Sequence, residues 1–464
     1  MAKGKVAVIG AGSASFGLSA LKGLLEARSL DGISIHLFDV NQDAVRRMGE
    51  LGRYVAAQRN IPKEVVAHDS LARCLEFADC VILSVAIDRE ECWRKDREIG
   101  LEFGIDHYAE NGGPAAIFHA ARNLGLIYPI LQEMERCCPQ AWLLNYTNPV
   151  TRISTAAARY STIRTIGVCH QLDFGYYMAG TILHEELGIE LPPHYHFRWN
   201  DESMASSHAI TCAAKERLHI LAAGLNHFTW ASAVCGRSDG KDWYPTLKER
   251  NATFDCTFEP LTRHVFDLFG IFPVPGDTHL CEYLPYTHSV PRKTWERMDM
   301  QMYDFDWSNR TRAKRAVLAH AVVNERNLAL LDQVGSERAE SLVEGLLLRN
   351  GYVDEAVNLP NEGGIPNLHP GSIVETPAVF LASGPSQLAC PPLPEPIAEL
   401  CRRQTLIDEL SVKGMMEGDR ECLLQALALD PMVDDVELPP RLLDRYLKEF
   451  EQYFRTLPGS CRLR

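Results

Sequence analysis

The 464-residue chain lacks the marks of several large protein classes. It has no apolar run of membrane-spanning length, and the opening stretch Val6–Ile9 is too short for the core of a signal peptide. Basic residues are in deficit, because 47 Lys and Arg stand against 61 Asp and Glu, which gives a net charge of −14 at pH 7. Such a charge repels phosphate backbones and anionic lipid. We therefore expect a cytoplasmic protein that binds neither membrane nor nucleic acid.

The 14 cysteines also lack a pattern. They are scattered along the chain, with no small disulfide framework and no CxxC pair at zinc-finger spacing. We expect reduced thiols, and any metal ion must take ligands that are distant in sequence.

The composition that remains is typical of a globular protein, with 46% hydrophobic and 23% charged residues, and this length predicts two or three domains. Short β-branched runs alternate with helical stretches at first, which predicts a doubly wound, Rossmann-like α/β domain over residues 1–195. The expected strands are Val6–Ile9, Ser34–Phe38, Cys80–Val85, Ala141–Asn145 and Thr165–Cys169. The expected crossover helices are Leu18–Ala27, Asp43–Arg59 and Gly113–Glu135.

The regular alternation fades after this region. Residues 196–464 predict a second, mixed α+β domain of the kind that completes lactate and malate dehydrogenases. Ser207–Ala213 and Leu218–Gly224 have the pattern of strands, whereas Thr311–Gln333 and Arg338–Leu348 have that of amphipathic helices.

A glycine-rich turn follows the first expected strand and opens the first helix, where backbone N–H groups can bind a pyrophosphate. In this GxGxxG-like pattern a serine stands in place of the third glycine. An aspartate ends the second strand, where its carboxylate can accept hydrogen bonds from both adenosine ribose hydroxyls, and this favours NAD over NADP. A glycine turn without a ligand and an aspartate that only begins a turn are the alternatives. The expected cofactor-binding residues are Gly10, Gly12, Ser13, Ser15, Phe16 and Asp39.

Three further segments carry polar residues at strand ends: Asn145–Pro149, Gly167–His170 and Gly224–Phe228. Ligands of open α/β sheets bind at the carboxyl ends of the strands. Cys169 and His227 could supply a thiolate and an imidazole to a divalent cation and leave positions for substrate oxygens. The alternative is that both are ordinary buried residues.

Together these motifs resemble glycoside hydrolase family four, the NAD- and manganese-dependent glycosidases. The resemblance covers nearly the whole chain, in blocks at Val8–Ser13, Asn145–Pro149, Cys169–His170, Gly224–Trp230, Gly276–Pro285, Asn358–Gly363, Asn367–Leu368 and Val374–Glu375. Within the family, Asn226–Trp230 and Gly276–Glu282 are most similar to the α-galacturonidase and α-galactosidase branch. The resemblance implies a homodimeric or homotetrameric enzyme that acts on an unphosphorylated glycoside, a uronide or a hexoside, with NAD and Mn²⁺ or another divalent metal.

The mechanism implied by the resemblance departs from two-carboxylate hydrolysis. NAD⁺ takes a hydride from C3 of the sugar, and a base removes the acidified C2 proton while the aglycone leaves. Water then adds to the enone, and the hydride returns. The resemblance implies that Cys169 and His227 hold the metal, that Asp277 is the base with His279 in reserve, and that Glu110 is the acid. The expected substrate-binding residues are Asn148, His170, Arg122 and His279.

Structural alternatives stand beside three of these roles. Asp277 could cap a turn, Glu110 could lie in the first turn of the helix that begins near Gly113, and Arg122 could be a solvated surface residue.

Two departures from the family pattern fall beside the expected sugar site. Thr278 stands where the galacturonidase-like branch has arginine, and Ala115 and Ala116 stand where it has two glycines. Loss of an arginine that could pair with a carboxylate weakens the case for a uronide, so a neutral hexoside or another anionic sugar, such as a sulfosugar, stays open. Two other functions also stay open: a net NAD-dependent dehydrogenase of a sugar or hydroxy acid, and an NAD-binding sensor without turnover.

Overall fold

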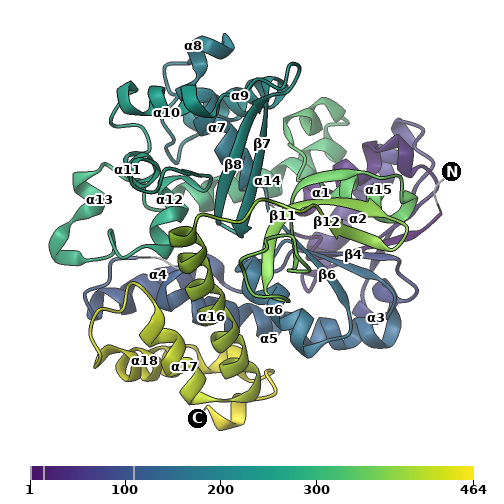
Figure 1. Ribbon diagram of the computed structural model, residues 1–464. Coiled ribbons are helices and arrows are strands. Elements are labelled where there is room, and N and C mark those ends of the chain that lie inside the picture. The colour runs from purple at the N-terminus through teal and green to yellow at the C-terminus, as the bar shows by residue number, and fades with distance from the viewer. Residues whose placement is uncertain (1–2, 14–15, 108–109, 464) are drawn as a thin grey trace.

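The computed structural model describes residues 3–13, 16–107 and 110–463, whose arrangement is shown in Figure 1. Its centre is a mixed sheet of 12 strands in the order β3-β2-β1-β4-β5-β6-β10-β11-β7-β8-β9, with β12 paired to β11. The strands are β1 (Lys5–Ile9), β2 (Ser34–Phe38), β3 (Glu64–His68), β4 (Cys80–Leu83), β5 (Trp142–Asn145), β6 (Arg164–Val168), β7 (Leu218–Leu225), β8 (Phe228–Gly236), β9 (Phe272–Pro273), β10 (Val353–Pro360), β11 (Ile373–Leu381) and β12 (Gly384–Gln387).

Strands β1 to β6 are parallel and follow the order 3-2-1-4-5-6 of a dinucleotide-binding domain. The predicted Rossmann-like sheet is therefore confirmed, and the five expected strands agree closely with the observed ones. The edge strand β3 was missed from the sequence. Its five residues begin with Glu64 and end with His68, and such a short, partly polar run gives little periodic signal.

The described chain forms 18 helices, some of which pack against the two faces of this sheet. They are α1 (Gly17–Glu26), α2 (Gln42–Gln58), α3 (Leu71–Leu75), α4 (Arg89–Glu102), α5 (Gly113–Cys137), α6 (Val150–Tyr160), α7 (Leu172–Ile182), α8 (His184–Leu187), α9 (Asp201–Arg217), α10 (Tyr244–Thr253), α11 (Pro260–Phe269), α12 (Gly276–Leu280), α13 (Thr294–Arg297), α14 (Phe305–Asn324), α15 (Ala339–Leu348), α16 (Glu395–Glu417), α17 (Arg420–Leu429) and α18 (Leu438–Phe454).

The strand expected at Ser207–Ala213 is wrong, because this segment is the middle of helix α9. The side chain of Asn200 caps the helix by accepting a hydrogen bond from the N–H of Ser203 at 2.8 Å. Two acidic residues in the first turn and two basic residues in the last turn also favour a helix. The neighbouring strand expected at Leu218–Gly224 is β7.

The segment expected as one helix at Thr311–Gln333 is divided. Helix α14 begins earlier, at Phe305, where Asp304 caps it, and ends at Asn324. A separate 3-10 turn then covers Leu328–Gln333.

The second half of the chain extends the same sheet with antiparallel strands. β10 pairs with β6 on one side and with β11 on the other, and β11 continues to β7, β8 and β9. The C-terminal helices α16, α17 and α18 return to the first half, where they lie at the lower left in Figure 1 and share one hydrophobic core with α5 and α6. The expected boundary after residue 195 falls between α8 and α9, and stays a prediction.

Among the described helices, none combines the length and the apolar character that a membrane crossing requires.

Candidate active site

The glycine turn after β1 allows a close backbone approach. Gly10 has a φ of +85°, and a Cβ atom there would lie 2.0 Å from the carbonyl oxygen of Ser84. At the end of β2, a carboxylate oxygen of Asp39 accepts a hydrogen bond from the N–H of Gly12 at 2.8 Å. The expected pyrophosphate-binding turn and the expected ribose-binding carboxylate are therefore in direct contact.

Sequence reasoning missed one glycine of this turn. Gly17 is the first residue of α1, and a Cβ atom there would lie 2.1 Å from the backbone oxygen of Ala11. The sequence did offer a signal, because Gly17 lies only two positions after Ser15, where the GxGxxG pattern has its third glycine. The Oγ of Ser13 accepts a hydrogen bond from the N–H of Phe16 at 3.3 Å, whereas the expected contact at Ser15 lies outside the described residues.

The expected metal ligands meet in space. The Sγ of Cys169 and the Nε2 of His227 are 3.7 Å apart, although 58 positions separate them in the sequence. Cys169 directly follows β6, and His227 lies in the two-residue turn between β7 and β8. The φ of His227 is +59°, a left-handed conformation that costs a residue with a side chain roughly 1–2 kcal/mol. Hairpin turns favour glycine at such positions, so the turn itself does not explain a histidine here.

Burial sets the protonation of this pair. Burial, with a contribution from the charge of Glu375, raises the pKa of the Cys169 thiol to about 12. Burial also lowers the pKa of the His227 imidazole well below its ordinary value, and its Nδ1 is a buried atom without a hydrogen-bond partner in the described part of the chain. The imidazole is thus neutral, which is its metal-binding form.

A buried carboxylate supports the hairpin that carries His227. One oxygen of Glu375, on β11, accepts hydrogen bonds from the side-chain amides of Asn226 and Asn358, each at 2.7 Å. Glu375 is 2% exposed, and burial raises its pKa. The turn residue next to His227 is therefore tied to the adjoining strands.

The expected acid lies in the loop before α5. A carboxylate oxygen of Glu110 accepts a hydrogen bond from the side-chain amide of Asn148 at 2.6 Å, and burial raises the pKa of the Glu110 carboxyl. Asn148 lies three residues after the end of β5, and its Oδ1 is buried without a partner in the part of the chain that the structure describes. That oxygen is available to a ligand.

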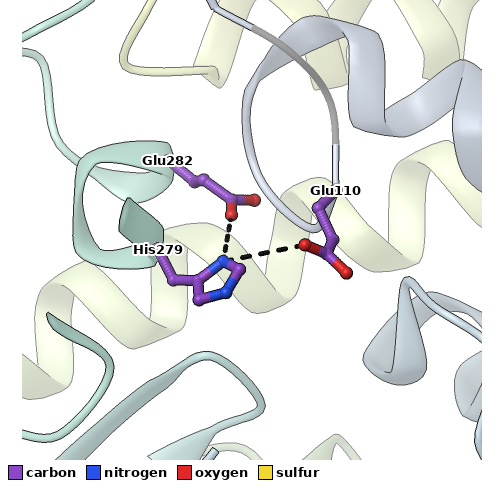
Figure 2. Close-up of side chains that lie close together, drawn as sticks. All are labelled: Glu110, His279 and Glu282. Atoms are coloured by element: carbon purple, nitrogen blue, oxygen red, sulfur yellow. Dashed lines mark hydrogen bonds and ion pairs between the residues drawn. The ribbon is translucent and has the colours of Figure 1, made fainter. Parts of the chain in front are cut away.

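A histidine lies between this glutamate and a second one (Figure 2). The Nδ1 of His279, on α12, is 2.7 Å from one oxygen of Glu282 and 3.9 Å from Glu110. Burial alone would lower the pKa of His279, but the hydrogen bond to Glu282 and the two carboxylate charges raise it above its ordinary value. These three residues offer ligand atoms within 4.8 Å of one another, so they form a second donor set for a cation. The ring of His279 lies 4.4 Å from that of His227, which joins the two groups into one site.

Comparison with known families agrees with this geometry. The family 4 glycosyl hydrolase model matches residues 5–179, and the model of that family's C-terminal domain matches residues 222–433. The chain belongs to glycosyl hydrolase family 4. The resemblance found in the sequence is confirmed, and the protein is an enzyme of the glycosidase class.

Relatives of this family 4 enzyme match it along almost its whole length. An alpha-glucosidase of Erwinia rhapontici is 27% identical, covering 95% of this chain and 96% of the relative. An alpha-galacturonidase of Thermoanaerobacterium saccharolyticum is 24% identical, covering 92% of this chain and 91% of the relative. The solved structure of a 6-phospho-alpha-glucosidase from gut microorganisms, in complex with NAD and Mn²⁺, has a TM-score of 0.77 at 18% identity and covers 98% and 99% of the two chains.

Asp277 of this family 4 enzyme is buried and caps a neighbouring helix. Its carboxylate accepts hydrogen bonds from the N–H groups of Leu261 at 3.1 Å and Thr262 at 2.7 Å, so it caps the N-terminus of α11. Its own N–H donates to Glu259 at 2.7 Å. Both carboxylate oxygens thus accept from backbone N–H groups, and the role of Asp277 as the base stays a prediction.

Arg122 packs between helices and away from solvent. The guanidinium is 1% exposed and forms two hydrogen bonds to the carboxylate of Asp96, at 3.0 and 2.6 Å. It also lies over the ring of Phe450, 4.2 Å from the ring centre. The arginine therefore joins α4, α5 and α18 and has no free donor face for a substrate.

His170 takes a different position from its neighbour Cys169. Its side chain is 67% exposed, and its Nδ1 lies 2.8 Å from a carboxylate oxygen of Glu337. The charge and hydrogen bond of Glu337 raise the pKa of His170 to about 9. A substrate contact by this imidazole stays a prediction.

Proposed function

We propose that this family 4 enzyme cleaves an unphosphorylated α-glycoside, a hexoside or a uronide, by NAD-dependent oxidation and elimination with a divalent metal. The observation that carries the proposal is the convergence of the Cys169–His227 pair with Glu110 and His279. The proposal also rests on the relatives called alpha-glucosidase and alpha-galacturonidase and on the NAD and Mn²⁺ bound by a structural neighbour. A homo-oligomeric state and a cytoplasmic location belong to the same proposal.

The residues present fit both cofactors. The glycine turn and Asp39 fit a dinucleotide, because Gly10 and Gly12 have no room for a side chain and the Asp39 carboxylate lies beside them, where it could bind a ribose. Cys169 and His227 fit a metal, because their Sγ and Nε2 atoms lie 3.7 Å apart, close enough to bind one ion, and a neutral imidazole is the form that binds metals. Bound NAD would accept and return the C3 hydride, and a bound divalent ion would act as a Lewis acid at the sugar oxygens.

His279 is proposed as the base that takes the C2 proton. Its contacts with the two carboxylates use Nδ1, and Figure 2 shows Nε2 turned away from both. With the Nδ1 proton donated to Glu282, Nε2 carries the free electron pair that accepts a proton.

Glu110 is proposed as the acid that protonates the leaving oxygen. Its raised pKa keeps the carboxyl protonated to a higher pH than an exposed glutamate, and Asn148 orients it. Loss of the aglycone after removal of the C2 proton gives the enone, and water adds at C1 before reduction restores the sugar. Glu110, having lost its proton, can then accept one from that water.

A test follows the hydrogen at C2. Aryl α-glucosides, α-galactosides and α-galacturonides are incubated in D₂O with the enzyme, NAD⁺, Mn²⁺ and a reductant. We expect one deuterium at C2 of the released sugar and no net NADH. Accumulation of one NADH per product would show a dehydrogenase instead. Retention of NAD without turnover of any glycoside would show a sensor, and either result refutes the proposal.

A further inference from the structure

The carboxylate of Glu282 connects the two groups proposed for proton transfer. The residue is 0% exposed and lies in the 3-10 turn Cys281–Tyr283, which follows α12. One oxygen lies 2.7 Å from the Nδ1 of His279. The other accepts hydrogen bonds from the N–H groups of Asn111 at 2.6 Å and Gly112 at 2.8 Å. A single side chain thus contacts the proposed base and the loop that carries the proposed acid.

The loop contact is close and leaves little freedom. A Cβ atom on Gly112 would lie 2.4 Å from the backbone oxygen of Glu282, so the two segments approach more closely than a side chain would permit. From another direction, the guanidinium of Arg152 donates to the backbone oxygen of Asn111 at 2.7 Å. Both the N–H and the carbonyl oxygen of Asn111 are therefore hydrogen-bonded, and these bonds restrain the backbone next to Glu110.

The histidine contact fixes which nitrogen is reactive. A carboxylate has no proton to give, so the Nδ1 of His279 must be the donor in this hydrogen bond. This tautomer leaves the electron pair on Nε2.

We propose that Glu282 is a positioning residue that sets the reactive tautomer of His279 and, through Asn111 and Gly112, the location of Glu110. The inference rests on the proposed function, because it assigns Glu282 a role in the elimination. Glu282 would affect the C2 proton transfer and the departure of the aglycone, but not the C3 oxidation that precedes them.

The Glu282→Gln variant separates this role from simple packing. The amide oxygen of glutamine can still accept from the two loop N–H groups, which places its NH₂ group against the Nδ1 of His279. The Nδ1 of His279 must then accept this hydrogen bond. The ring proton therefore moves to Nε2, and Nε2 can no longer take a proton from the substrate. The volume is conserved, and we expect the variant to fold.

The experiment measures two steps in the NAD⁺- and Mn²⁺-loaded enzyme. Formation of enzyme-bound NADH in a single turnover reports C3 oxidation, and deuterium uptake at C2 in D₂O reports the proton transfer. For Glu282→Gln we expect bound NADH to form within about three-fold of the normal rate while C2 exchange falls roughly 100-fold or more. The primary isotope effect of a C2-deuterated substrate should rise, because proton transfer becomes the slow step.

Two further variants complete the test. Glu259→Gln is the matched control. The carboxylate of Glu259 also accepts a hydrogen bond from α12, but its donor is the backbone N–H of Asp277 and not the side chain of His279. We expect it to lower the two rates by the same factor, if at all. His279→Gln should reproduce the selective loss of C2 exchange, and adding Glu282→Gln to it should cause little further loss.

The outcomes distinguish this inference from the proposed function. If the unmodified enzyme incorporates no C2 deuterium with any glycoside that it cleaves, the proposed function fails. If it does exchange and Glu282→Gln exchanges equally fast, only the inference fails. Loss of Mn²⁺ binding in Glu282→Gln, measured by titration calorimetry, would make Glu282 a metal ligand and would also overturn the positioning role.

Discussion

Breaking the ion pair between Asp96 and Arg122 should destabilise the protein far more than breaking a surface pair. The two side chains are 0% and 1% exposed and make two hydrogen bonds, of 3.0 and 2.6 Å. Asp96→Asn conserves the volume but leaves the guanidinium buried without a counter-charge. Removing one partner of a buried pair costs about 3–5 kcal/mol, so we expect the free energy of unfolding to fall by that amount.

A matched control lies on the same helix. Arg94, also on α4, pairs with Asp306 at 2.7 Å, but these side chains are 42% and 76% exposed. Water and salt screen such a pair, so Asp306→Asn should cost less than about 1 kcal/mol. Urea unfolding followed by circular dichroism compares the two variants under one set of conditions.

The double replacement Asp96→Leu with Arg122→Met tests the cause of the loss. Apolar side chains leave no buried charge, so roughly half or more of the stability lost in Asp96→Asn should return. The KM of the double variant should stay close to normal, because Arg122 has no free face for a substrate. A stable Asp96→Asn variant, or a double variant that folds well but has a greatly raised KM, would refute this account of Arg122.

Four other predictions concern separate parts of the molecule. Cys169→Ser should weaken Mn²⁺ binding by more than about 100-fold in calorimetry; unchanged affinity would place the ion among the carboxylates near His279 instead. Asp39→Ala should weaken NAD binding by roughly 10- to 100-fold and reduce the preference over NADP in fluorescence titrations, whereas an unchanged preference would contradict the ribose contact. Asp277→Asn should lower the free energy of unfolding by about 1–2 kcal/mol with C2 exchange retained, and loss of exchange in a folded variant would restore it as the base. Burial, with the charges of Lys5 and His68, lowers the pKa of His36 from 6.5 to about 4. Because the unfolded chain binds this proton at a higher pH than the folded one, the free energy of unfolding should fall by about 1–2 kcal/mol as the pH drops from 6.5 toward 4. The His36→Gln variant should show a smaller dependence of stability on pH.

The sequence predicted those parts of the fold that local pattern determines. The parallel strands and the glycine turn are specified by short apolar runs and by residues adjacent in the chain, and they are confirmed. The continuation of the sheet through β10 and β11 was not predictable in this way, because the pairing of Val357 with Val168 joins residues that are far apart in the sequence. The helix at α9 was misread because its apolar residues are sparse, so caps and charges determine it more than periodicity does.

The candidate site shows the same difference between residues that local sequence identifies and residues whose roles depend on distant partners. Residue chemistry and the family resemblance were enough to select Cys169 and His227, which do meet. The burial of Arg122 depends on Phe450 and Asp96, which come from helices α18 and α4, and nothing in the sequence around Arg122 indicates either partner. Chain-distant contacts of this kind decide whether a charged residue serves the substrate or the fold.

The different orientations of Asp277 and His279 follow from helical geometry. Successive residues of a helix are rotated by about 100°, so two side chains separated by two positions on α12 point about 200° apart. They cannot both face one site. The free N–H groups at the start of α11 attract the carboxylate of Asp277 to one side, and this turns His279 toward Glu110 and Glu282 on the other. Removing the cap should therefore disturb the orientation of the base indirectly, so Asp277→Asn, which keeps one acceptor oxygen, should preserve more C2 exchange than Asp277→Ala.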